Sequence, residues 1–61
     1  MNRIEKEEEI RDRLNELYEV AMLFRRRLDT ADMYRRDYIT KELKETEEEI
    51  EELRIQWLKL N

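Results

Sequence analysis

Apolar residues recur every three or four positions through both halves of this chain, and this repeat limits the folds open to it. The first repeat consists of Ile10, Leu14, Leu17, Ala21, Phe24 and Leu28. The second repeat consists of Ile39, Leu43, Thr46, Ile50, Leu53, Trp57 and Leu60. Steps of four and three place these residues along one side of a helix, at the a and d positions of a coiled coil. Each half of the chain is therefore expected to form a helix with one narrow apolar side.

The two repeats are out of register, because eight residues rather than seven separate their equivalent positions, Leu28 and Arg36. Between them lies the segment 29–32, Asp-Thr-Ala-Asp, whose residues are typical of helix caps and turns. We expect Asp29 or Thr30 to cap the second helix, with Asp32 in its first turn. The sequence predicts an all-α antiparallel helical hairpin of one domain, residues 1–61. Its helices are expected over about 3–28 and 31–60, with a turn over about 29–31. The alternative is one continuous helix that dimerises in parallel.

An antiparallel hairpin pairs the a positions of one helix with the d positions of the other. The expected pairs are Leu17 with Leu43, Ala21 with Ile39, Ile10 with Ile50, and Leu14 with Thr46. The charged residues beside this contact would then pair as Arg11 with Glu47 and Arg13 with Glu49. We interpret Thr46 as a small residue tolerated in the contact rather than a polar marker of register. The expected intrachain seam consists of Ile10, Leu14, Leu17, Ala21, Phe24, Leu28, Ile39, Leu43, Thr46, Ile50, Leu53 and Trp57.

Composition excludes most catalytic chemistry. The 61 residues include no Gly, Pro, Cys or His. A chain without Cys and His lacks the ordinary ligands of zinc, haem and iron–sulfur clusters, and one without Gly has no phosphate-binding loop. We expect no catalytic residue, cofactor, metal site or small-molecule substrate. The longest apolar run, residues 20–24, is too short to span a membrane, and the N-terminal residues lack the apolar core of a signal peptide. The expected location is the cytoplasm, with no membrane partner.

A chain of this length seldom supplies enough core for a stable monomer, and no disulfide can support this one. More apolar residues lie outside the seam than two helices can cover. These candidate partner-facing residues are Tyr18, Met22, Leu23, Tyr34, Tyr38, Ile55 and Leu58. We expect them to pack against a second copy in a four-helix homodimer, with a different protein partner as the alternative. The expected function is a non-catalytic structural or protein-interaction module that self-associates through its heptad repeats.

Charge is divided along the predicted rod. Five arginines surround the turn, namely Arg25, Arg26, Arg27, Arg35 and Arg36. Residues 42–52 contain seven Glu and one Lys. The arginines are a candidate phosphate patch, through which a small RNA-binding regulator would act. Interleaved Asp residues and a net charge of -4 argue against a nucleic-acid partner. In an antiparallel dimer, the basic tip of one copy would meet the acidic part of the other.

The turn sequence Leu-Asp-Thr-Ala-Asp at 28–32 is similar to the Leu-Asp-x-Asp bend of the Rop-like hairpin family, with one residue inserted. The resemblance implies an antiparallel four-helix homodimer that binds paired RNA loops. That family contacts RNA with polar, basic and Phe side chains on the outer face of its first helix. Here that face carries Glu5, Glu8, Glu9, Asp12, Glu16 and Glu19, so no RNA contact carries over. The chain also resembles de novo designed helical bundles, which would have no biological function.

Overall fold

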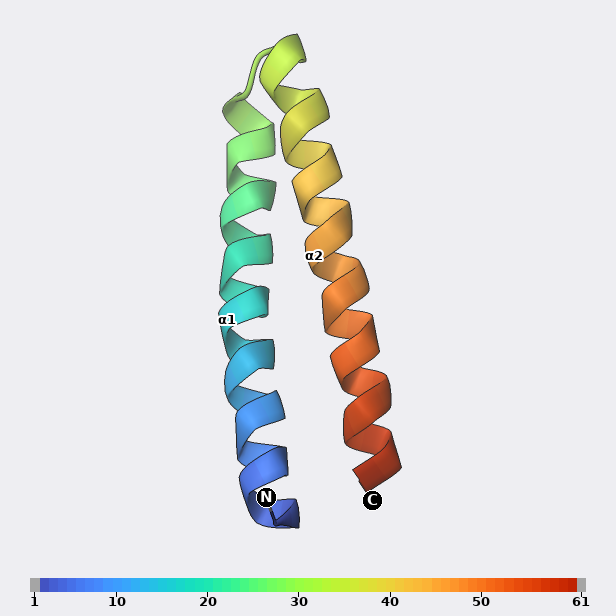
Figure 1. The fold of residues 1–61 in the computed structure, drawn as a ribbon. Helices are drawn as coiled ribbons and strands as arrows, with labels where there is room; N and C mark the ends of the chain where they lie inside the picture. The colour runs from blue at the N-terminus through green and yellow to red at the C-terminus, as the bar shows by residue number, and fades with distance from the viewer. Residues whose placement is uncertain (1, 61) are drawn as a thin grey trace.

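The computed structural model describes residues 2–60, and all regular structure in this range is helical. Two α-helices, α1 (Arg3–Thr30) and α2 (Met33–Leu60), lie side by side in antiparallel orientation (Figure 1). They form a rod of 46 × 14 × 14 Å along its principal axes. The predicted all-α hairpin is confirmed, and the alternative of one continuous helix is wrong. Residues 1 and 61 of the predicted domain lie outside the described residues.

Side-chain caps set the start of both helices. At the start of α1, Asn2 Oδ1 accepts a hydrogen bond of 2.8 Å from the Glu5 backbone N–H. At the start of α2, Asp32 Oδ1 accepts one of 2.9 Å from the Arg35 backbone N–H. Each bond satisfies a backbone donor that the first turn of a helix cannot pair internally.

The expectation that Asp29 or Thr30 caps the second helix is wrong, because both residues extend α1 by a further half turn. Only Ala31 and Asp32 connect the helices. Ala31 has extended backbone, with φ -79° and ψ 145°, and no described residue has a positive φ. Such a connection needs no glycine, which explains how a chain without Gly makes so short a turn.

The core is a single row of side chains between the helices. The buried residues are Ile10, Leu17, Ala21, Ile39, Thr46 and Ile50. The other residues of the expected seam are partly buried, namely Leu14, Phe24, Leu28, Leu43, Leu53 and Trp57. Leu17, Ala21 and Ile50 form the centre of the core, with Leu14, Leu43 and Leu53 packed against it.

The helices pair one heptad further along α2 than we expected. In the expected register Ile50 would face Ile10, whereas Ile50 packs in one cluster with Leu17 and Ala21. An ion pair between the helices shows the same displacement, because Arg25 lies 3.0 Å from Glu47. In the expected register these two residues would be about 18 Å apart along the helix axis, beyond the reach of both side chains.

This displacement is visible at both ends of the rod. The first turn of α2 extends beyond the last turn of α1, and the first turn of α1 extends beyond the last turn of α2 (Figure 1). A shift of seven residues keeps every a and d position in the seam. It changes which residue of α2 lies at the same height along the rod as a given residue of α1, that is, which residues are level. Leu17 is now level with Ile50, and Val20 with Glu47.

Candidate functional site

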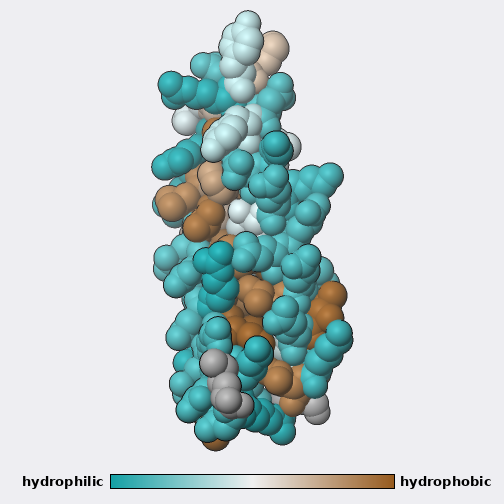
Figure 2. Space-filling view, viewed as in Figure 1, coloured by the Kyte–Doolittle hydropathy of each residue, from teal (hydrophilic) through white to brown (hydrophobic). Residues whose placement is uncertain are grey.

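Large apolar side chains are exposed along most of the rod. The seven candidate partner-facing residues keep between 45% and 89% of their surface accessible, with Tyr34 the most exposed. Apolar groups interrupt the hydrophilic surface in several separate places rather than in one patch (Figure 2).

One group of apolar residues borders a groove near the carboxyl end of α2, which we call the C-terminal groove. It has a volume of about 380 Å³. The residues that line it are Arg11, Leu14, Tyr18, Arg54, Trp57 and Leu58. The two guanidinium groups have only long ion pairs with neighbours on their own helices. Arg11 lies 3.8 Å from Asp12, and Arg54 lies 3.9 Å from Glu51. Both cations thus retain donors that another molecule could use.

A second groove, which we call the turn groove, lies where the chain reverses. It has a volume of about 440 Å³. The residues that line it are Phe24, Arg27, Thr30, Ala31, Arg35, Tyr38 and Ile39. Within residues 2–60, no carboxylate forms an ion pair with Arg27 or Arg35. This groove therefore combines an apolar floor with uncompensated positive charge.

The structure separates the candidate partner-facing residues. Tyr18 and Leu58 line the C-terminal groove, and Met22 lies one helical turn from Tyr18. Tyr38 lines the turn groove, and Leu23 lies one turn from Arg27 of the same groove. The remaining two, Tyr34 and Ile55, line neither groove. The sequence pattern identified exposed apolar residues, but it did not show that they fall on different sides of the hairpin.

The five arginines of the candidate phosphate patch do not share one site. Arg25 is held by Glu47 of the opposite helix at 3.0 Å. Arg27 and Arg35 line the turn groove, whereas Arg26 and Arg36 do not. One of the five guanidinium groups, that of Arg25, therefore already forms an ion pair with a carboxylate.

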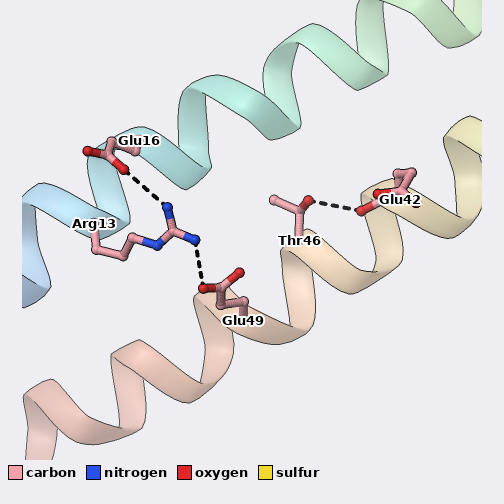
Figure 3. A network of polar contacts seen from close by, with 5 residues as sticks. All are labelled: Arg13, Glu16, Glu42, Thr46 and Glu49. Carbon is pink, nitrogen blue, oxygen red and sulfur yellow. Dashed lines mark hydrogen bonds and ion pairs between the residues drawn. The ribbon is translucent and has the colours of Figure 1, made fainter.

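Polar contacts beside the seam help to hold the two helices together (Figure 3). Arg13 donates to Glu49 at 3.0 Å and to Glu16 at 3.1 Å. The predicted Arg13–Glu49 pair is therefore confirmed although the register behind it is wrong, because a long arginine side chain spans the axial offset of about 7.5 Å that the shift introduces. The hydrogen bond with Glu49, followed by the one with Glu16, raises the pKa of Arg13 above its usual range. The expected pair of Arg11 and Glu47 is wrong, because the shifted register brings Arg25 to Glu47 instead.

Thr46 is buried, and its hydroxyl donates to the Glu42 carbonyl at 2.9 Å (Figure 3). This bond lies within α2, so the side chain makes no polar contact with α1 that could specify register. The interpretation of Thr46 as a small, tolerated residue agrees with this geometry.

Sequence reasoning missed Arg11 and Arg54 as residues of a binding groove. Arg11 was expected only as the partner of Glu47, and no prediction involved Arg54. The available signal was their spacing, because Arg11 lies one heptad before Tyr18, and Arg54 lies one turn before Leu58. Each arginine therefore shares a helix side with an exposed apolar residue.

Neither helix contains a stretch long and apolar enough to cross a membrane. Across residues 2–60, no three carboxylates gather in a way that could hold a metal ion. Comparison with protein-family models, with curated proteins and with solved structures gave no match. The resemblance to Rop-like hairpins therefore extends only to the two-helix architecture.

Proposed function

We propose that this chain is a non-catalytic interaction module that associates with a second copy of itself, as an antiparallel four-helix homodimer. The observation that carries the proposal is the surface that the hairpin leaves uncovered. The chain exposes 5291 Å². A compact monomer of the same mass would expose about 4,400 Å². The excess of about 900 Å² is close to the roughly 800 Å² that each partner contributes to a standard protein interface.

The character of the exposed surface supports the same conclusion. Two grooves have apolar linings with arginines beside them. Burying these apolar linings against another apolar surface would stabilise the complex, since each Å² of apolar surface removed from water contributes about 25 cal/mol. Symmetric dimers are the commonest oligomers, and a second copy supplies matching surface from one gene product.

Sedimentation equilibrium combined with light scattering tests the proposal. Between about 1 and 500 μM, the range in which weak dimers populate, the mass should rise from the 7.8 kDa of one chain toward twice that value. Circular dichroism should show thermal stability that increases with concentration, because dimerisation stabilises the folded state by mass action. A folded chain that keeps the monomer mass at every concentration would contradict self-association.

A further inference from the structure

We propose that the second copy docks on the side of the hairpin that carries the C-terminal groove, antiparallel, about a two-fold axis at the level of Val20 and Glu47. This assignment rests on the proposed self-association and names its face and geometry. We call this side the groove face. It consists of positions spaced four and three apart, from Ile4 to Asp29 on α1 and from Met33 to Leu58 on α2.

The groove face carries arginines at one end and aspartates at the other. Arg11 and Arg54 border the groove at one end, with only the long contacts described above. Asp29 and Asp37 lie at the turn end, and neither forms an ion pair within the described residues. An antiparallel copy would bring Arg11 level with the partner's Asp29, and Arg54 within one helical turn of the partner's Asp37. Each charge would thereby gain a partner of opposite sign.

The two helices independently indicate the same axis. On α1, the residue midway between Arg11 and Asp29 is Val20. On α2, Lys44 and Glu51 are also on the groove face, and their midpoint lies next to Glu47. Val20 and Glu47 are level only in the observed register. In the register expected from sequence, these two midpoints would be about 10 Å apart along the rod, and one two-fold axis could not satisfy both helices.

Apolar residues occupy the centre of the same arrangement. Tyr18 and Met22 flank the level of Val20 on the groove face, so Tyr18 of each copy would meet Met22 of the other across the axis. The partner's Met22 would lie against Tyr18 at the edge of the C-terminal groove, where a flexible thioether can pack on an aromatic ring. Tyr18 and Met22 keep 46% and 50% of their surface accessible in the single chain. An apolar centre with a charged rim is the usual composition of a specific interface.

A parallel arrangement on the same face is electrostatically unfavourable. It would place α1 of one copy over α2 of the other at the same level. Arg11 would then meet the partner's Arg54, and Arg25 would approach the partner's Lys44. Like charges brought close together across an interface disfavour its formation. In the antiparallel arrangement Glu47 would approach the partner's Glu47 at the axis, but each of these carboxylates is already paired with Arg25 of its own chain at 3.0 Å. The remaining groove-face contacts named above therefore favour the antiparallel orientation.

A pair of charge-reversed chains tests this face. The first chain carries Arg11→Glu and Arg54→Glu, and the second carries Asp29→Lys and Asp37→Lys. Each chain alone should self-associate at least about tenfold more weakly than the original, because both arginine–aspartate contacts become like-charge contacts. An equimolar mixture should recover association, since the two chains complement each other. Mass measurements on each chain and on the mixture give the result.

Matched controls change the net charge equally on the outer sides of the helices. Arg26→Glu with Lys41→Glu is the control for the first chain, and Glu19→Lys with Glu48→Lys is the control for the second. These four residues are exposed and have no ion pair in the described range. The controls should associate as the original chain does. If the controls associate as weakly as the test chains, the loss of association is due to net charge, and the assignment of the groove face is overturned.

Orientation is measured by distances between spin labels, which are simple to place because the chain has no Cys. In an antiparallel dimer, labels at Glu19→Cys lie close to the axis. Labels at Arg35→Cys are separated by about 36 Å along the rod. A parallel dimer would give similar short distances for both positions. That result would overturn the orientation.

The outcomes separate this inference from the proposed function. If the original chain remains a monomer, self-association itself is wrong, and this assignment fails with it. If the original chain dimerises but the two reversed chains also dimerise normally, the function stands and the groove face is excluded as the interface.

Discussion

Replacing Leu17 with Ala tests the central layer of the seam. Leu17 is 4% exposed and packs with Ala21 and Ile50. Truncating a buried leucine to alanine costs about 2–5 kcal/mol, because the cavity left behind closes only partly. A core of this size supplies in total about 3–5 kcal/mol. We therefore expect Leu17→Ala to remove most of the helical structure from the isolated chain at 25 °C.

The matched control is Leu23→Ala, the same chemical change six residues further along α1. Leu23 is 50% exposed and lies outside the groove face, so its truncation should cost less than about 1 kcal/mol. Urea denaturation followed by circular dichroism at 222 nm, at several concentrations, gives the free energy of unfolding of each variant. A loss below about 1 kcal/mol for Leu17→Ala, or equal losses for the two variants, would show that the seam is misplaced.

Three further substitutions test local contacts, each by thermal denaturation. Asp32→Ala should cost about 0.5–2 kcal/mol through loss of the α2 cap, whereas Asp29→Ala should have little effect; equal losses would refute the capping assignment. Thr46→Val should be neutral or stabilising by up to about 1 kcal/mol, because the hydroxyl bonds only within its own helix; a large loss would reveal a contact across the seam. Arg13→Lys should lower the melting temperature slightly, and less so in high salt, since lysine cannot bridge both carboxylates. Because the pKa of Arg13 is raised, the stability that its charge contributes is fully present at neutral pH and is lost only above the usual arginine range. An Arg13→Lys variant as stable as the original would show that bridging the two carboxylates adds nothing.

The seam could be predicted from sequence because burial along a helix repeats every three or four residues, and the apolar residues follow that period. All of the buried residues belong to the two repeats. The register could not be predicted by the same reasoning. A displacement of seven residues returns every a and d position to the seam, so periodicity alone cannot distinguish the two pairings. Contacts such as Arg25–Glu47, which depend on both helices at once, are needed to choose between them.

The turn illustrates a second limit. Asp29, Thr30 and Asp32 are all favourable caps, so local propensity alone does not identify which one is used. The choice depends on how far α1 continues before the chain reverses, which is a property of the packed hairpin. The grooves were missed for a related reason. Each joins residues of both helices, and their apposition follows from the register rather than from either repeat alone.

The arrangement of the core as one row has a consequence for the motions of the chain. Each layer of the seam touches only the layers before and after it, so the two helices can separate from an end without disturbing the middle. Local opening should therefore require least free energy near the turn and near the chain ends, and most at the layer of Leu17 and Ile50. Amide hydrogen exchange would then be slowest at the middle of each helix and would become faster toward both ends of the rod.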